Sequence, residues 1–215
     1  MPKRSNELLY QDIYAYEPVA ILGGSFNPIH KGHLLMAETA HEQLGTDIII
    51  MPNKATYYKE SHKNISDENR IDMIKLAIED KDYLYYSDME IKRGGITHTI
   101  DTIRELQKNK LDRIVYFIIG GDSLEWVDKW VEADELLRRV HFLSAVRGDM
   151  DIQKSQAIID RIKKEHPDSN ISLMNMEECP ISSSDIRDDI KNGRDIKGRV
   201  PESVENYIIN NKLYK

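Results

Sequence analysis

The chain has 215 residues, with 30 lysines and arginines against 37 aspartates and glutamates, and a net charge of −7. This length suits one large domain or a domain with a small appendage, and the acidic balance, without a long basic block, argues against a nucleic-acid partner. The single cysteine, Cys179, excludes an internal disulfide and a cysteine-based zinc cluster, and the lack of a secretory leader or a membrane-length apolar run predicts a cytoplasmic protein without a membrane partner.

Six apolar runs rich in β-branched residues predict strands buried on both faces of a parallel sheet. In chain order these are residues 19–22, 48–51, 84–86, 114–119, 140–146 and 171–174. Amphipathic segments between them predict helices over residues 33–44, 67–79, 99–107, 123–130, 133–139 and 153–164. This alternation predicts an α/β fold, a Rossmann-like doubly wound parallel sheet with right-handed crossovers.

The end of the chain differs, because two helices are predicted there without a strand between them. They span residues 184–191 and 201–210, with Gly193 after the first and Pro201 at the first position of the second. The sequence therefore predicts three parts: an N-terminal extension over residues 1–17, an α/β core over 18–180, and a small C-terminal helical cap over 181–215. It leaves open whether the extension forms a short docked helix or is disordered.

The most informative stretch joins the first strand to the first helix, and it reads Gly23-Gly24-Ser25-Phe26-Asn27-Pro28-Ile29-His30-Lys31-Gly32-His33. Unpaired N–H groups and partial positive charge at a helix start favour a phosphate, and glycines let it approach the backbone. His30 and His33 can both donate to a phosphate chain. Capping or surface positions would also explain these histidines, whereas zinc would lack a third ligand. Dinucleotide-binding and Walker A loops are excluded, because the required glycines and Gly-Lys-Ser/Thr are missing.

A second helix start reads Ser182-Ser183-Ser184-Asp185-Ile186-Arg187. Its hydroxyls and unpaired N–H groups suit an anion, and Arg187 lies one turn into the helix, where it can reach the same anion. Helix N-capping explains the serines without any ligand.

The strand predicted over residues 114–119 leads into Gly120-Gly121-Asp122, at the sheet edge where such folds bind ligands. Asp122 would bind ribose hydroxyls or lie near a metal, or else cap the next helix. Trp130 would stack on a flat ring, or else belong to the core, since Trp126 and Trp130 would share one face of the predicted helix.

Two further segments offer polar side chains. The stretch 53–65 carries Lys54, Lys59, His62 and Lys63, of which one lysine would reach over a triphosphate; a solvated basic loop is the alternative. Residues 97–102 place threonine hydroxyls at a helix start, where they would bind a small carboxylate or cap the helix.

Together these motifs resemble those of the bacterial nicotinate-nucleotide adenylyltransferases, in the nucleotidyltransferase superfamily with the H-x-G-H motif. The resemblance extends from about Val19 to Tyr207. The family's Gly-Gly-Ser/Thr-Phe-x-Pro-x-His-x-Gly-His matches residues 23–33, its Ile-Ser-Ser-Thr-x-Ile-Arg is similar to residues 181–187, and its Phe-Ile-Ile-Gly-x-Asp to residues 117–122. Trp130 and a Thr-x-Asp-Thr segment, residues 99–102, point to the nicotinate branch.

Three departures from the family pattern are visible. The family's Pro-Pro-His-Lys after the second strand is replaced by residues 56–59, which keep Lys59 but place Tyr58 where the histidine stands. The family's Tyr-Thr is here His98-Thr99, and residues 1–17 have no counterpart. The first two departures lie where such enzymes hold the pyridine nucleotide.

The resemblance implies transfer of AMP from ATP to nicotinate mononucleotide, giving nicotinate adenine dinucleotide and pyrophosphate in NAD biosynthesis. It implies that residues 181–215 complete the ATP site. The implied catalytic residues are His30, His33, Lys59 and Arg187. The implied ATP contacts are Gly23, Gly24, Ser25, Phe26, His33, Gly120, Asp122, Ser182, Ser183 and Arg187, and the implied mononucleotide contacts are Asn27, Lys59, Thr99, Asp101 and Trp130. Mg²⁺ is expected to arrive with ATP, held by phosphates and water, so no protein metal ligand is predicted.

Other readings of the same residues differ in the acceptor or in the reaction. The alternative function that differs least is the same adenylyl transfer with nicotinamide mononucleotide as the acceptor, because His98 leaves recognition of the nicotinate carboxylate open. A phosphopantetheine acceptor is disfavoured by His30, where that branch usually has threonine. A non-catalytic nucleotide sensor would keep the pocket without the reaction, and a tRNA-charging enzyme would need more domains than this length allows. A homodimer is compatible with the sequence, which leaves the oligomeric state open.

Overall fold

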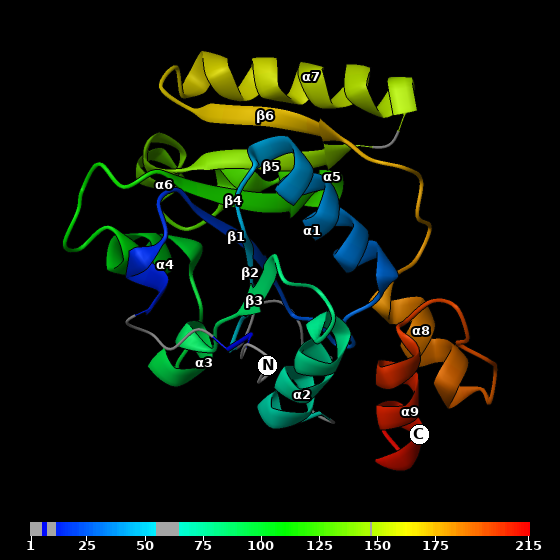
Figure 1. The fold of residues 1–215 in the computed structure, drawn as a ribbon. Coiled ribbons are helices and arrows are strands. Elements are labelled where there is room, and N and C mark those ends of the chain that lie inside the picture. The colour runs from blue at the N-terminus through cyan, green and yellow to red at the C-terminus, as the bar shows by residue number, and fades with distance from the viewer. Residues whose placement is uncertain (1–5, 8–11, 55–64, 147) are drawn as a thin grey trace.

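A computed structural model describes residues 6–7, 12–54, 65–146 and 148–215. In this part of the chain, six parallel strands form one sheet in the order β3-β2-β1-β4-β5-β6 (Figure 1). The strands are β1 Val19–Gly24, β2 Ile48–Pro52, β3 Leu84–Tyr86, β4 Val115–Gly120, β5 His141–Val146 and β6 Asn170–Asn175. The chain turns back between the adjacent strands β1 and β4, which makes their carboxyl ends the switch point of a doubly wound sheet. The predicted fold class is confirmed.

The strands read as continuous apolar runs because both faces of the sheet are buried. Along β1, Ala20 and Leu22 face one hydrophobic core, while Val19 and Ile21 face the other. Ile50 and Ile118 join the first core. The apolar runs thus predicted the positions of the strands, and both ends of each predicted strand lie within two residues of the ends in the structure.

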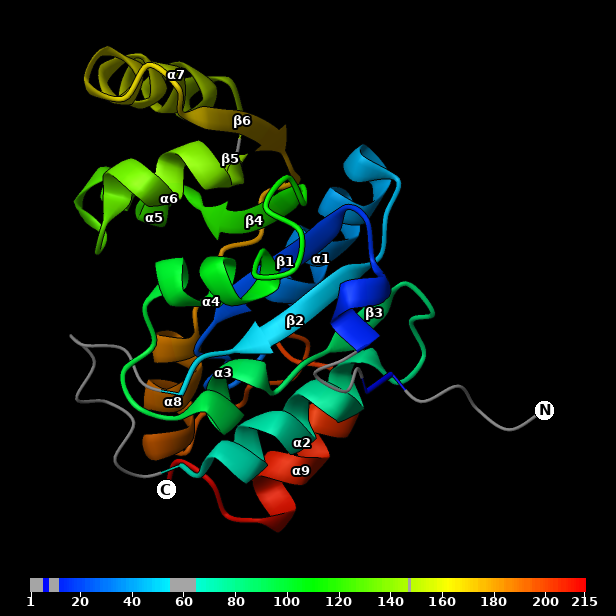
Figure 2. The ribbon, with the colours of Figure 1, turned by 90° about the vertical axis from the view of Figure 1, so that its left-hand side faces the viewer.

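Helices cover the two faces in separate layers (Figures 1 and 2). The core containing Leu22 is covered by α1 Lys31–Leu44, α2 Asp67–Ile78, α8 Ser183–Lys191 and α9 Glu202–Asn210. The opposite core is covered by the 3-10 helix η1 Asp12–Ala15 and by α3 Met89–Arg93, α4 Thr99–Leu106, α6 Ala133–Arg139 and α7 Gly148–Glu165. Val204 and Ile208 of α9 pack into the same core as Ala20 and Leu22 of β1. The predicted boundary between the α/β core, residues 18–180, and the helical cap, residues 181–215, stays a prediction.

The helix predicted over residues 123–130 is wrong as one element. The segment forms two short turns, α5 Gly121–Leu124 and the 3-10 helix η3 Val127–Lys129. Trp126 is 62% exposed, whereas the Trp130 ring meets the edges of Phe117 and Phe142. A continuous helix would have placed both tryptophans on one face, so tertiary packing of Trp130 outweighs the helical pattern. The short helix α3 was not predicted, because five residues are too few for a periodic signal.

The N-terminal extension contacts the rest of the fold wherever the structure describes it. Glu7 forms a parallel β-bridge to Tyr86, and the Asn6 amide donates to the carbonyl oxygens of Ile78, Lys81 and Leu84 at 2.9–3.1 Å. Ile13 of η1 is fully buried. The described residues of the extension, 6–7 and 12–17, are therefore docked on the fold.

Candidate active site

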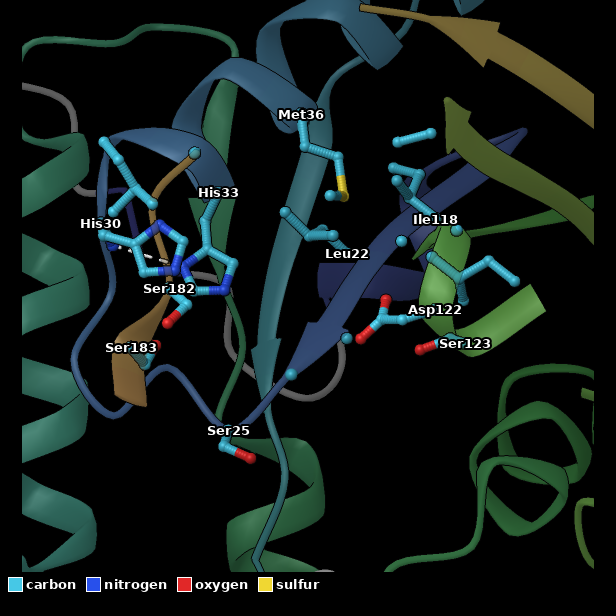
Figure 3. Close-up of a pocket in the computed structure, with 18 of the residues that line it drawn as sticks. Leu22, Ser25, His30, His33, Met36, Ile118, Asp122, Ser123, Ser182 and Ser183 are labelled. Atoms are coloured by element: carbon cyan, nitrogen blue, oxygen red, sulfur yellow. Dashed lines mark hydrogen bonds between the residues drawn. The ribbon is translucent and has the colours of Figure 1, made fainter. Parts of the chain in front are cut away.

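A cavity of about 1120 Å³ opens at the carboxyl ends of β1 and β4. Its walls come from the loop after β1, the starts of α1 and α8, the segment after β4, and α7. Figure 3 shows His30 and His33 near Ser182 and Ser183 on one side, with Asp122 and Ser123 on the other. The two helix starts that the sequence singled out therefore open into one cavity.

The two histidines lie at the start of α1 with their rings stacked 3.7 Å apart between centroids. His30 is the N-cap residue and is 6% exposed; His33 is partly exposed and meets the edge of Phe26. The backbone N–H of His30 donates to Nδ1 of His33 at 3.2 Å. A neutral His33 ring must then carry its proton on Nε2. This tautomer makes Nε2 of His33 a hydrogen-bond donor.

The glycines before this helix are required by the packing of aromatic rings. A Cβ at Gly23 would lie 2.6 Å from the Phe117 ring, and one at Gly24 would lie 3.0 Å from the Phe26 ring. Phe26 itself is buried with a left-handed φ of 47°, a conformation that costs a non-glycine residue free energy and persists only when its surroundings impose it. The loop therefore has a specific shape that depends on these aromatic contacts.

Four side chains from elsewhere in the chain bind this loop. Arg70 of α2, which is 3% exposed, donates to the Ser25 carbonyl and to the Asn53 carbonyl at 2.7 Å each. It also pairs with Asp67 at 2.6 Å. The remaining contacts are Arg187 Nη1 to the Asn27 carbonyl at 2.8 Å, Ser183 Oγ to the Pro28 carbonyl at 2.9 Å and the Tyr214 hydroxyl to Asn27 Oδ1 at 2.8 Å. Sequence reasoning missed Arg70 and Tyr214, because no local pattern marks either residue.

The start of α8 combines a cap with an anion-accessible surface. Ser182 is the N-cap residue, and its Oγ accepts from the backbone N–H of Asp185 at 3.1 Å. The capping alternative is thus confirmed for Ser182, which still lines the cavity with Ser183 and Arg187. Cap and binding roles are compatible, since the N–H groups of a helix start remain directed outward.

The segment after β4 forms another wall. Gly120 is the N-cap residue of α5, so the alternative of Asp122 as a cap is wrong; Asp122 is exposed and lines the cavity. Trp130 is partly buried and also lines the cavity, with Phe117 and Phe142 at 6.4 and 6.0 Å between ring centroids. Trp130 therefore packs against the core and also lines the cavity, while its stacking on a flat ring stays a prediction.

Three predicted site residues are not among those lining the cavity. Thr99 is the first residue of α4, and Asp101 lies 3.9 Å from Arg104 on the same helix. Lys59 lies outside the described residues, as does Tyr58. Their roles toward a ligand stay predictions.

Comparisons with known proteins place the chain in a family. The cytidylyltransferase-like family model matches residues 21–189. A protein of Lachnoclostridium phytofermentans, named a probable nicotinate-nucleotide adenylyltransferase, is 40% identical over 91% of this chain and 98% of its own length. One of Rhodopirellula baltica with the same name is 38% identical, over 92% of this chain and 93% of its own. The chain belongs to the nicotinate-nucleotide adenylyltransferase family.

Solved structures show the same fold at lower identity. The nicotinic acid mononucleotide adenylyltransferase of Plasmodium falciparum, complexed with NaAD, has a TM-score of 0.76 and 22% identity, covering 93% of this chain and 98% of that chain. The same protein complexed with APC has a TM-score of 0.69 and 23% identity over the same shares. The family resemblance inferred from the motifs is confirmed.

The helices α3 and α4 share a buried polar network. Glu90 is 4% exposed and accepts from Thr102 Oγ1 at 2.5 Å, while Arg93 donates to Thr102 Oγ1 at 2.9 Å and to Glu105 at 2.8 Å. Burial raises the pKa of Glu90 to about 7, although Thr102 and Arg93 act to lower it. The network joins the two helices on either side of residues 94–98, which also connect to the end of β2 through Lys54 N–H and Thr97 Oγ1.

This raised pKa predicts a pH dependence of stability. Between the ordinary pKa of 4.5 and about 7, the folded protein holds a proton on Glu90 that the unfolded chain has lost. The contribution of Glu90 to the free energy of unfolding therefore falls as pH rises through this window. Urea unfolding from pH 4.5 to 8 should show a smaller decline in the free energy of unfolding for Glu90→Gln than for the wild type. An equal dependence of this free energy on pH in both proteins would contradict the raised pKa.

In the described part of the chain, no helix is both long and apolar enough to cross a membrane. Among the same residues, no group of three or more histidine, cysteine, aspartate or glutamate side chains is arranged to hold a metal ion.

Proposed function

We propose that this chain transfers the AMP moiety of ATP to nicotinate mononucleotide, releasing pyrophosphate and forming nicotinate adenine dinucleotide for NAD biosynthesis. The observation that carries the proposal is the convergence of two helix starts, those of α1 and α8, on one cavity at the switch point of the sheet. Each start favours phosphate. At about 1120 Å³ the cavity exceeds the usual range for a single small ligand, which suits two nucleotides.

The chemistry needs neither a general base nor a covalent intermediate. The acceptor phosphate has a second pKa of about 6, so it is largely dianionic at neutral pH. Its oxygen forms a bond to the α-phosphorus of ATP, and the bond from the α-phosphorus to the bridging oxygen breaks. The electron pair leaves with pyrophosphate, whose growing charge must be stabilised. Alignment and charge stabilisation therefore supply the catalysis.

The positions of the cavity side chains support a set of proposed phosphate contacts. His30 and His33 donate to the α- and β-phosphates as charge builds on the leaving group. Arg187, with Ser182 and Ser183 at the start of α8, holds the triphosphate from a second direction. Arg187 Nη2 also contacts Ser184 Oγ at 3.1 Å, which fixes its guanidinium at the cavity wall. Lys59 is proposed to approach the phosphates from the segment that follows β2.

The other contacts divide between the two nucleotides. Backbone N–H groups of Ser25 and Phe26, beside Gly23 and Gly24, would bind a phosphate, while Gly120 and Asp122 would hold a ribose. Trp130 would contact the nicotinate ring, and Asn27, Thr99 and Asp101 would complete the mononucleotide side. A homodimer stays a proposal, which the molecular mass in solution would test.

Magnesium fits this site as a companion of ATP. The cavity carboxylates Asp122, Glu125, Asp151 and Asp185 form no metal-binding group among the described residues. Mg²⁺ prefers phosphate and water oxygens with few protein ligands, so we propose that ATP phosphates and water hold it. When bound, it would neutralise part of the triphosphate charge.

Pyrophosphate release tests the proposed function. The protein is incubated with ATP and Mg²⁺ together with nicotinate mononucleotide, nicotinamide mononucleotide, phosphopantetheine or no acceptor. We expect release with nicotinate mononucleotide at the highest kcat/KM, and formation of the matching dinucleotide. Faster release with nicotinamide mononucleotide would establish that alternative acceptor. ATP binding without release for any acceptor would indicate the nucleotide sensor.

Replacing Trp130 with alanine should weaken the binding of nicotinate mononucleotide and leave ATP binding nearly unchanged. The reason is that Trp130 supplies a flat apolar surface to the cavity, and aromatic contacts of this kind contribute about 0.5–1.5 kcal/mol beyond area burial. Isothermal titration with each ligand separately measures both affinities. Trp126→Ala is the matched control, because Trp126 is 62% exposed and does not line the cavity. Equal loss of both affinities in Trp130→Ala would refute the assignment.

A further inference from the structure

The cavity wall between β4 and α6 consists of two very short helical turns. α5 has four residues and η3 has three, and helices of this length have almost no stability of their own. Leu124 and Val127 anchor the segment by burial. The same segment presents Gly121, Asp122, Ser123, Glu125 and Trp130 to the cavity. Contacts from outside the segment must therefore determine where this wall lies.

Arg161 of α7 supplies such contacts at two points. Its Nη1 donates to Asp128 Oδ2 at 2.7 Å, and its Nη2 donates to the Glu125 carbonyl at 3.3 Å. Ile158, one turn earlier on α7, lines the cavity. The face of α7 that borders the cavity thus also binds the wall that carries Trp130.

Asp128 depends on this contact. Its side chain is only 1% exposed, whereas that of Arg161 is 43% exposed. Burial by itself would raise the pKa of Asp128, but hydrogen bonds from Arg161 and Lys129 hold it below the ordinary value. Asp128 Oδ1 has no hydrogen-bond partner among the described residues. Without Arg161, the remaining partner of Asp128 would be Lys129, which is 61% exposed and lies 3.4 Å from Oδ2. Because a poorly paired buried carboxylate is costly, losing Arg161 would favour movement of Asp128 toward water.

Movement of Asp128 would displace Trp130. The two residues are separated only by Lys129 in the sequence. The backbone N–H of Trp130 donates to the Val127 carbonyl at 3.3 Å within the same turn. The Trp130 ring meets Phe117 and Phe142 in nearly perpendicular edge contacts at 6.0–6.4 Å between ring centroids, so a shift of the turn would also disturb these contacts. The turn and the ring are therefore expected to move together.

We propose that Arg161 and Asp128 are positioning residues, whose ion pair fixes the Trp130 ring in the cavity and so sets the affinity for the acceptor mononucleotide. This inference rests on the proposed function for the identity of the ligand. The position of the ring itself is testable without that function.

The experiment uses Trp130 as a fluorescent reporter. The chain has two tryptophans, so Trp126→Phe leaves Trp130 as the only one. In this background we compare Asp128→Asn, Arg161→Gln and the double variant. The control is Lys163→Gln, an exposed position on the same helix. Acrylamide quenching measures access to Trp130, isothermal titration measures both ligands separately, and far-ultraviolet circular dichroism checks the fold.

We expect stronger quenching of Trp130 in both single variants, and about a tenfold higher Kd for nicotinate mononucleotide, equivalent to about 1.4 kcal/mol. The Kd for ATP and kcat at saturation should not change. The double variant should resemble either single one, because the two residues act as a unit. Arg161→Gln, altered at a half-exposed side chain, keeps the test valid if Asp128→Asn fails to fold.

Two failures are distinguishable. Unchanged quenching in a folded Arg161→Gln variant would overturn the positioning role. Increased quenching with an unchanged mononucleotide Kd would support the positioning of the ring and refute the ring contact assigned to Trp130 in the proposed function.

Discussion

Replacing His33 with alanine is expected to lower kcat by about 10²–10³, because loss of one preorganised donor removes about 2.7–4 kcal/mol of transition-state stabilisation. The cost to folding should be smaller. His33 Nδ1 accepts one backbone hydrogen bond, from His30, and such a bond contributes about 0.5–1.5 kcal/mol. Steady-state pyrophosphate release at saturating ATP and mononucleotide gives kcat, and urea unfolding gives the stability.

His41→Ala is the matched control for this prediction. His41 lies on the same helix, contacts the Thr46 carbonyl at 2.8 Å and stacks on Tyr83, away from the cavity. It should lose some stability and keep its kcat. A near-normal kcat in His33→Ala would show that the ring is a cap and not a phosphate donor.

Replacing Arg70 with methionine is expected to lower the free energy of unfolding by about 3 kcal/mol, the cost of leaving buried polar groups without partners. The Ser25 and Asn53 carbonyls would both lose their donor. Asp67 would keep its ion pair with Lys54, which limits the cost. Because Ser25 belongs to the loop at the cavity, activity should fall as well.

Lys75→Met provides the comparison on the same helix, since the Lys75 side chain is exposed and its Nζ lies 5.2 Å from the centroid of the Tyr86 ring. Its stability should change by less than about 1 kcal/mol. Denaturation by urea, followed by circular dichroism, measures both variants. If Arg70→Met unfolds at the same midpoint as Lys75→Met, the loop is held by other contacts.

Local sequence was sufficient for the sheet and for the two helix starts. The strands are recognisable because both faces of the sheet are buried, so most strands are nearly continuous apolar runs; β6 at the sheet edge is the weakest of them, with both ends exposed. The stretch from Gly23 to His33 is recognisable because several rare requirements, for glycines and for histidines at fixed spacing, fall within eleven residues. Each of these signals lies within a short continuous segment of the chain.

The remaining features depend on contacts between distant parts of the chain. Arg70 is 45 residues from Ser25, Tyr214 is 187 residues from Asn27, and Arg161 is 33 residues from Asp128. None of these pairs has a local pattern. The break between α5 and η3 likewise follows from packing of Trp130 on Phe117 and Phe142, which outweighs the helical periodicity of residues 123–130.

The loop that carries the histidines has a consequence for the order of events during synthesis. Its shape relies on Arg70, Ser183 and Arg187. The ribosome makes Arg187 about 150 residues after His33, a delay of roughly 8–30 s at about 5–20 residues per second. A nascent chain that has already formed β1 and α1 therefore still lacks the second half of the proposed phosphate-binding surface. We expect that nucleotide does not act as an early template for folding, and that tight binding begins only when α8 has left the exit tunnel.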